Sequence, residues 1–387
     1  MEMEELKNKY SFSDGLMEKI KHSIEVLRKG EEFALRFYDK GYYLAFSGGK
    51  DSQALYHITK LAGVKFEAHM NMTTVDPANV VSFVKNNYPD VIRHIPDINF
   101  YQLIRKKKCL PSRTQRYCCE VLKERGGGGT VTLVGIRAEE SRTRSKRNEI
   151  GTSKRKYDIS FDQFDEHKEK MVSCVGGKDK VLISPILAWT DKDVWEFLNK
   201  MNIKHCDLYD KGMKRIGCIL CPMSNIGEMM KYPFNYPHQT KKFLNEIEIL
   251  VKNGHYRELG KNPNIVLAWY LSKRTVDDFK GLVGKIQSGK FRPNKKNKEL
   301  WDKFIDYFDL KKRKHMGKII GAKVRTLCPL KSKGGTVIEK GEICTITKSY
   351  KGYGIRTDDY REITRVDKCC VEFIKGQNMV DKTKEAY

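Results

Sequence analysis

The feature that most constrains this chain is a six-residue glycine turn, Ser47-Gly48-Gly49-Lys50-Asp51-Ser52. An apolar run, Tyr42–Phe46, precedes it and a helix-like segment, Gln53–Leu61, follows it, which predicts a strand, a turn and a helix start. Glycine lets the backbone approach an anion closely, and the N–H groups and dipole of a helix N-terminus favour negative charge. Lys50 adds a mobile cation, and Asp51 is suited to holding Mg²⁺. The turn therefore predicts a phosphate-binding site.

The hexapeptide differs from both common phosphate motifs. The P-loop has four residues between its first glycine and Gly-Lys, and the dinucleotide motif reads G-x-G-x-x-G. As it stands, SGGKDS resembles the pyrophosphate loop of the N-type ATP pyrophosphatases. That superfamily includes the phosphoadenosine phosphosulfate (PAPS) reductases, the tRNA thiolation enzymes and the DNA phosphorothioation enzymes. The resemblance implies an adenine nucleotide, ATP with Mg²⁺, held by the whole turn, with Lys50 and Asp51 catalytic: Ser47, Gly48, Gly49, Lys50, Asp51 and Ser52.

Strand-like and helix-like segments alternate around this turn. Beyond the first strand, strands are expected over residues 64–70, 91–95, 130–136 and 181–187, and helices over residues 53–61, 79–87 and 191–198. This alternation predicts a doubly wound, Rossmann-like α/β fold with a parallel sheet. The resemblance identifies it as the adenine nucleotide alpha hydrolase-like fold. In such sheets the ligand binds outside the carboxyl ends of the strands, where SGGKDS lies.

At 387 residues the chain is long enough for two or three domains. We expect N-terminal helices over residues 1–38, the nucleotide-binding α/β domain with its cysteines over 39–224, and a helical region over 225–318. Short alternating segments separated by glycine turns then predict a small SH3-like β-barrel over 319–376. Residues 377–387 lack such a pattern and are expected to form a frayed tail.

Two cysteine groups carry a second signal. One is an adjacent pair, and the other is a C-x-x-C turn framed by glycine and proline over residues 217–222. A C-x-x-C turn places two thiolates at one metal, and a second pair completes four ligands. The arrangement resembles that of the iron–sulfur adenosine phosphosulfate (APS) reductases. On that resemblance a [4Fe–4S] cluster is expected on Cys118, Cys119, Cys218 and Cys221.

Alternatives to this cluster stay open. Two adjacent cysteines are awkward ligands for one metal, so Cys206 or Cys109 is a possible replacement for Cys119. Zinc is the alternative metal, since four thiolates suit it as well. A structural interpretation makes Cys118 and Cys119 buried core thiols and the C-x-x-C segment a bare turn.

Two further segments match the PAPS reductases. Residues 135–144 resemble their G-x-R-x-x-E-S-x-x-R segment, which implies nucleotide-binding roles for Gly135, Arg137 and Arg144, with Arg137 also catalytic. Arginines at the carboxyl end of a strand can clamp a phosphate or sulfate with two hydrogen bonds. Residues 189–195 resemble the family's W-x-x-x-D-V-W segment, for which we expect a structural role as a capped helix. A solvated basic loop is the alternative interpretation of residues 135–144.

The end of the second strand, Met70–Asp76, is the next candidate. In related enzymes this position meets the adenine and ribose, which implies contacts from Asn71, Thr73 and Asp76. An ordinary strand-end turn is the alternative.

Charge and composition narrow the setting. The net charge of +25 indicates an anionic partner such as a nucleic acid or a nucleotide, although a lysine-rich coding bias on a solvated surface explains it equally well. The basic segment 141–156 is expected to be an exposed loop. The sequence has no apolar run of about 18 residues, and its first residues are charged, so neither a membrane span nor secretion is expected. Its eleven cysteines therefore favour a metal or catalytic role in the cytoplasm over disulfides.

The intact loop favours ATP as the substrate. PAPS and APS reductases bind an adenylated sulfate that has already lost pyrophosphate, and their loops depart from SGGKDS. They also carry a catalytic cysteine near the C-terminus, which residues 379–387 lack. We therefore expect cleavage of ATP to AMP and pyrophosphate, which adenylates an acceptor for sulfur transfer. The expected acceptor is tRNA or DNA, and a donor protein would supply the sulfur.

Two alternatives remain. One is a PAPS or APS reductase that releases sulfite with a thioredoxin-like reductant. The other is a non-catalytic module that binds nucleotide and nucleic acid, for which the terminal barrel is the main argument.

Overall fold

The chain divides into two compact units, which comprise Met1–Phe279 and Lys280–Tyr387. The structure is a computed structural model, and the part of it described here comprises residues 3–154, 156–177, 179–311, 323–327, 329–332, 335–348, 353–359, 361–366 and 371–373. None of the helices in these ranges combines the length and the apolarity that a membrane span requires.

A seven-stranded sheet forms the centre of the first unit, in the order β3-β2-β1-β4-β7-β5-β6. The strands are β1 (Tyr42–Ala45), β2 (Phe66–Asn71), β3 (Ile92–His94), β4 (Val131–Leu133), β5 (Ile150–Thr152), β6 (Asp158–Ile159) and β7 (Val181–Ile183). The run from β3 to β7 is parallel, and the predicted α/β fold with a parallel sheet is confirmed. The strands β5 and β6 extend it with antiparallel pairs.

The strand β5 corrects the expectation of an exposed loop over residues 141–156. Ile150 and Thr152 are buried and pair with β7, although basic residues surround them in the sequence. Two inward-facing side chains are enough to anchor a three-residue edge segment, and such a short signal is hidden by its charged neighbours.

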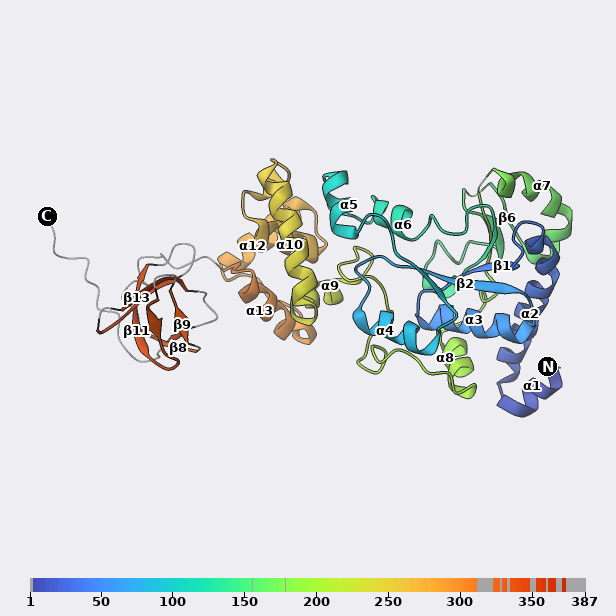
Figure 1. Cartoon of the computed structure of the whole chain (residues 1–387), viewed down its shortest axis with the longest axis horizontal. Helices are drawn as coiled ribbons and strands as arrows, with labels where there is room; N and C mark the ends of the chain where they lie inside the picture. The colour runs from blue at the N-terminus through green and yellow to red at the C-terminus, as the bar shows by residue number, and fades with distance from the viewer. Residues whose placement is uncertain are drawn as a thin grey trace. The chain divides into compact units, whose positions relative to one another are not determined.

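Helices cover the sheet, and α2 lies beside α3 next to β1 (Figure 1). The helices of this unit up to the cysteine turn are α1 (Met3–Tyr10), α2 (Asp14–Leu35), α3 (Lys50–Ala62), α4 (Ala78–Asn87), α5 (Phe100–Lys107), α6 (Tyr117–Leu122), α7 (Phe164–Gly176) and α8 (Asp191–Lys200). In α2 the apolar side chains Leu16, Ile20 and Ile24 repeat at four-residue spacing and are buried, as an amphipathic helix requires. They share one core with the sheet.

The segment after residue 225 is helical, as expected. Its helices are α9 (Ile226–Asn235), α10 (Pro237–Lys252), α11 (Pro263–Ser272), α12 (Val276–Gln287) and α13 (Lys298–Tyr307). Within the first unit, α10 contacts both α5 and α11. The division between the two units falls inside α12. The domain boundaries at residues 38, 224 and 318 stay predictions.

The end of the second unit is built from antiparallel strands, as the expected small barrel requires. The strands are β8 (Lys323–Thr326), β9 (Leu330–Lys331), β10 (Val337–Ile338), β11 (Ile343–Lys348), β12 (Tyr353–Thr357), β13 (Glu362–Val366) and β14 (Val371–Phe373). A five-stranded sheet runs in the order β13-β12-β11-β8-β14, and β9 pairs with β10. These strands enclose their own apolar core around Val324, Ile346 and Ile355. The predicted tail at 377–387 lies outside the described residues.

Candidate functional site

The glycine turn connects β1 to the N-terminus of α3. Gly48 has a φ of +74°, in the left-handed region that favours glycine. A Cβ at this position would lie 2.7 Å from Cγ2 of Val84 and 2.9 Å from Cγ1 of Val80, so α4 packs directly against the turn. Gly49 is the N-cap residue of α3. The turn is therefore held in place both by its backbone conformation and by packing.

Two serines close the turn on itself. The Ser52 hydroxyl donates a hydrogen bond to the carbonyl of Gly49 (2.8 Å) and accepts one from the Ser47 N–H (3.2 Å). The hydroxyl groups of Ser47 and Ser52 lie 3.2 Å apart. These bonds preform the loop around the start of α3, where backbone N–H groups are available to an anion.

Four charged groups meet beside the loop. The Lys50 Nζ lies 2.9 Å from Oδ1 of Asp191 and 3.5 Å from Oδ2 of Asp51. The Arg137 guanidinium donates to Oδ1 of Asp51 (2.6 Å) and to Oδ1 of Asp191 (3.0 Å). Both cationic side chains are only 4% exposed, and so two carboxylates each bridge two buried cations.

The electrostatics of this network favour the ionised forms. Burial alone would raise the pKa of Asp191, but Lys50 and Arg137 outweigh it and hold that pKa below its usual range. Burial likewise opposes the charge on Arg137, and Asp51 and Asp191 overcome it and raise the pKa of the guanidinium. A further carboxylate, Glu139, accepts a hydrogen bond from Arg137 at 3.0 Å.

Sequence reasoning missed three members of this site: Asp191, Glu139 and Tyr209. Asp191 and Glu139 lie inside segments that resemble the PAPS reductases, but the sequence indicates only a structural role, as a capped helix, for residues 189–195. Thr190, the neighbour of Asp191, does cap α8, with its hydroxyl accepting from the N–H of Asp193. The Tyr209 hydroxyl accepts a hydrogen bond from the Lys50 N–H (2.8 Å), and no local sequence pattern indicated that contact.

The structure brings Gly135 and Arg137 to the loop. A Cβ on Gly135, two residues after the end of β4, would lie 3.0 Å from the carbonyl oxygen of Asp51, which is closer than an ordinary contact, so glycine favours this approach. Arg144 is linked to Arg137 through Glu140. It forms an ion pair with the Glu140 carboxylate, which also accepts a hydrogen bond from the Arg137 N–H at 3.1 Å.

The residues at the end of β2 contact each other and the second cysteine group. Asp76 accepts hydrogen bonds from the N–H and the hydroxyl of Thr73 (2.6 and 2.7 Å). The Cys218 thiol lies 3.4 Å from the Thr73 hydroxyl. The side-chain amide of Asn71 donates to the carbonyl of Lys123 (3.0 Å). The carboxyl end of β2, the strand next to β1, is therefore in contact with both cysteine segments.

The four predicted cysteine ligands lie on two segments, the first pair in α6 and the second in the C-x-x-C turn. Each is a partly exposed free thiol: Cys118, Cys119, Cys218 and Cys221. A hydrogen bond from Cys118 lowers the pKa of Cys119, and Arg116, which donates to its sulfur at 3.3 Å, acts in the same direction. The same thiol contact raises the pKa of Cys118, with Cys221 and Cys218 contributing through their charge.

These thiols are the right donors for a cluster or a zinc ion, but they are not arranged as a finished site. Among the residues that the structure describes, no group of three or more Cys, His, Asp or Glu side chains is positioned to hold a metal ion. Of the alternative ligands, Cys206 is buried beside Asp207, and Cys109 lies 3.8 Å from the side chain of Gln115.

The helices after residue 225 hold the cysteine segments from outside. The Tyr270 hydroxyl donates to the carbonyl of Leu220, inside the C-x-x-C turn, at 2.9 Å, and Lys273 donates to the carbonyl of Ser224. Leu220 has a φ of +62°, so this turn adopts a conformation that a non-glycine residue rarely takes.

The other cysteine segment is held in the same way. Arg105 of α5 forms a bidentate ion pair with the buried Glu246 of α10 (2.5 and 2.6 Å). The Tyr256 hydroxyl accepts from the Leu110 N–H (2.7 Å).

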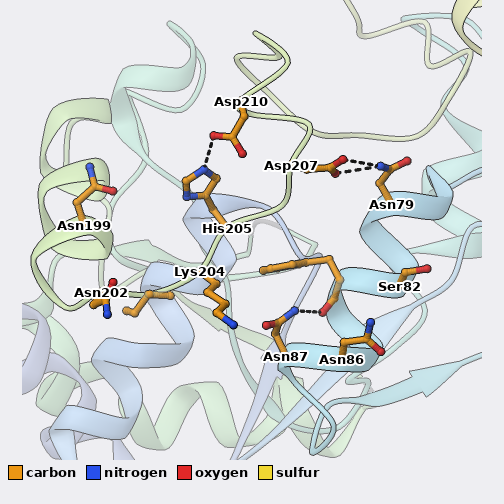
Figure 2. A pocket seen from close by; sticks show the side chains of 12 residues that line it. Asn79, Ser82, Asn86, Asn87, Asn199, Asn202, Lys204, His205, Asp207 and Asp210 are labelled. Carbon is orange, nitrogen blue, oxygen red and sulfur yellow. Dashed lines mark hydrogen bonds and ion pairs between the residues drawn. The ribbon is translucent and has the colours of Figure 1, made fainter.

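Two of the hollows in the described part of the chain have linings without the residues predicted for the nucleotide loop. One, of about 570 Å³, flanks the Cys118 segment: Lys107, Cys109, Thr114, Gln115, Arg116, Tyr117, Glu120 and Glu124. The other, of about 700 Å³, lies between α4 and the segment after α8. Figure 2 shows its polar lining, in which Asn79 faces Asp207 and His205 faces Asp210.

Comparison with known proteins gives a family for part of the chain. Residues 41–224 match the phosphoadenosine phosphosulfate reductase domain. An uncharacterised protein of Methanocaldococcus jannaschii is 26% identical over 58% of this chain and 43% of its own length. An adenosine 5′-phosphosulfate reductase of Staphylococcus haemolyticus is 24% identical over 49% of this chain and 74% of its own length. The chain spans about half the length of the archaeal relatives it matches.

Solved structures resemble the fold only distantly. The phosphate complex of a PAPS reductase from Candida auris is 14% identical, with a TM-score of 0.35 over 54% of this chain and 96% of that one. An FMN adenylyltransferase from Candida glabrata, in complex with FMN and an ATP analogue, is 15% identical, with a TM-score of 0.34 over 56% of this chain and 72% of that one.

Proposed function

Since residues 41–224 are a domain of the PAPS reductase-like family, we propose that the chain cleaves ATP to AMP and pyrophosphate and adenylates an acceptor for sulfur transfer. This nucleotide-binding family of sulfur metabolism belongs to the PP-loop superfamily, which is the superfamily of the N-type ATP pyrophosphatases. The observation that carries this proposal is the pair of buried cations, Lys50 and Arg137, placed beside a preformed loop at the N-terminus of α3. Such a site suits a polyphosphate better than a single anionic group, because it offers two cations and several N–H donors.

In this mechanism the loop holds the leaving group. The N–H groups of the turn and Lys50 bind the β- and γ-phosphates, and Arg137 neutralises charge near the α-phosphate. Asp51 would hold the Mg²⁺ that accompanies the nucleotide, since Mg²⁺ is commonly bound by one or two carboxylates together with substrate phosphates. An acceptor oxygen attacks the α-phosphorus, the bond to the bridging oxygen breaks, and pyrophosphate leaves with that electron pair. A sulfur nucleophile then displaces AMP. Catalysis is mostly positioning and electrostatic stabilisation.

The labelled substrate gives the direct test. With ATP labelled at the α-phosphate and tRNA or DNA present, the wild type should release labelled AMP together with pyrophosphate. Lys50→Ala should abolish this release, while Lys40→Ala, which removes a 57% exposed lysine outside the loop, should retain it. Turnover that Lys50→Ala leaves unchanged would exclude the loop from the reaction.

A nucleic acid as acceptor is supported by the charge around the Cys118 segment. The exposed lysines Lys106, Lys107 and Lys108 follow one another at the end of α5, and Arg116 lines the neighbouring hollow. Reversal of the three lysines to glutamate should weaken tRNA or DNA binding and flatten its salt dependence. The matched control reverses the exposed Lys295, Lys296 and Lys298. Equal loss in both triple variants would make the effect one of net charge alone.

The cysteines would hold the iron–sulfur cluster. The donor chemistry fits, since Cys118, Cys119, Cys218 and Cys221 are free thiols and Arg116 donates to the Cys119 sulfur, but among the described residues no three of them are positioned around one point. A cluster bound there would supply a sulfur-ligated redox or sulfur-binding centre. Anaerobically purified protein should contain about four irons and four sulfides per chain, and Cys221→Ser should lose most of both. A colourless protein that carries zinc would favour the alternative metal.

A sulfonucleotide reductase is the second candidate, because relatives of this chain are APS reductases. That function predicts sulfite release from APS or PAPS with a thioredoxin-like reductant, without ATP. Sulfite release in that assay, with no labelled AMP in the ATP assay, would replace the first proposal.

A further inference from the structure

The groups that a bound phosphate needs are already occupied by the protein's own side chains. Asp191 pairs with Lys50 Nζ at 2.9 Å and with Arg137 Nη2 at 3.0 Å. The Tyr209 hydroxyl takes the Lys50 N–H at 2.8 Å. Both contacts come from α8 and the segment that follows it, and not from the loop itself. We infer that Asp191 is a displaceable stand-in for phosphate, which makes the loop selective for polyphosphates over single phosphate or sulfate groups. This inference rests on the proposed function.

Asp191 is the member of the network that is free to leave. Its side chain is 54% exposed, whereas that of Asp51 is 22% exposed and lies in the first turn of α3. If the Asp191 carboxylate turns away, Arg137 still has Asp51 and Glu139 as partners. Among the described residues, Lys50 Nζ then keeps one carboxylate, that of Asp51, at 3.5 Å. The vacated position is therefore the place where a new anion gains most from Lys50.

The backbone of α8 does not have to move for this exchange. Thr190 and Asp193 form a capping box that fixes the start of the helix. The Asp191 N–H donates to Glu139 at 2.6 Å, which anchors its main chain. A rotation of the Asp191 side chain toward solvent is enough to free Lys50 Nζ and Arg137 Nη2 for an anion.

The exchange discriminates by charge. A single phosphate offers Lys50 and Arg137 about the same interaction that Asp191 already provides, and it also loses its own hydration on entering. A polyphosphate carries more charge and can reach the N–H groups of the loop at the same time as the two cations. The Asp191 carboxylate therefore lowers the affinity for every anion, and it lowers the affinity for the smallest anions most.

The test compares inorganic phosphate with tripolyphosphate by isothermal titration on the full chain. Asp191→Asn should bind inorganic phosphate at least tenfold more tightly than the wild type, with a smaller gain for tripolyphosphate. Asp191→Glu should stay close to the wild type. Asp210→Asn removes one charge from a 68% exposed carboxylate that pairs with His205, and it should change neither affinity. Asp191→Ser repeats the measurement if Asp191→Asn fails to fold.

The outcomes separate this inference from the proposed function. Phosphate affinity that is unchanged or weaker in both Asp191→Asn and Asp191→Ser overturns the stand-in role while leaving the loop as a nucleotide site. A wild type that binds neither tripolyphosphate nor ATP overturns the proposed function as well.

Discussion

Replacement of Gly48 by alanine tests whether the loop is fixed by packing as well as by backbone conformation. The left-handed φ of +74° costs an alanine about 1–2 kcal/mol. The new methyl group would also lie 2.7 Å and 2.9 Å from the γ-carbons of Val84 and Val80, and relief of such an overlap costs about 1–3 kcal/mol. Valine side chains on a helix have one strongly preferred rotamer, so they cannot turn aside easily. Gly48→Ala should therefore destabilise the fold by about 2–5 kcal/mol.

The same helix supplies a matched control. Gly63, at the C-terminal end of α3, has a φ of +73°, and a Cβ there would meet nothing within 4 Å. Gly63→Ala should cost only the conformational part, about 1–2 kcal/mol. Urea unfolding of both variants measures the difference, which isolates the contact with α4.

A second variant confirms the cause. In Gly48→Ala combined with Val84→Ala, the overlap with Cγ2 is removed, and the double variant should be more stable than the sum of the two single effects predicts. Gly48→Ala that is no more destabilising than Gly63→Ala would refute the argument that α4 fixes the loop.

Three further changes have defined outcomes. Arg105→Ala removes the partner of the buried Glu246 carboxylate and, because the Arg105 side chain is itself 55% exposed, should cost about 1–3 kcal/mol in urea unfolding. Lys252→Ala, at the exposed pair with Glu248, should cost less than about 0.5 kcal/mol; equal losses would contradict this difference. Burial lowers the pKa of His57 to about 4, so the folded state binds fewer protons than the unfolded state, and stability should fall as the pH drops from about 6.5 to 4. His57→Gln should flatten that part of the profile by up to about 3 kcal/mol, and the exposed His238→Gln should not. Arg137→Met leaves Asp51 and Asp191 facing Lys50 alone and should cost about 3 kcal/mol; a neutral result would show that the network does not stabilise the fold.

The order of strands and helices around the loop could be predicted because each element carries a local pattern. The turn at residues 47–52 follows an apolar run and precedes a helix, and the structure has β1 and α3 there. By contrast, β5 has only two buried side chains within a basic segment, which is too short for periodicity to detect.

The candidate site was only partly predictable for a different reason. Lys50 and Arg137 lie in motifs, but their partner Asp191 stands next to a helix cap, where an acidic residue has an ordinary local explanation. Its contact with Lys50 depends on how α3 and α8 pack together, and sequence periodicity does not report the pairing of two distant helices. Tyr209 was missed for the same reason, since its hydrogen bond with the Lys50 N–H depends on how the segment after α8 packs against α3.

The hydrogen bonds from Tyr270 and Lys273 to the C-x-x-C segment determine which segment of this protein can be exchanged with a relative. If only residues 41–224 of this chain, the matched domain, are moved into a relative, the carbonyls of Leu220 and Ser224 lose Tyr270 and Lys273 as donors, and Arg105 loses Glu246. A hybrid that exchanges residues 1–279 keeps all three contacts inside one piece. The segment to exchange between relatives is therefore longer than the matched domain, and it includes the helices after residue 225 that contact the cysteine segments.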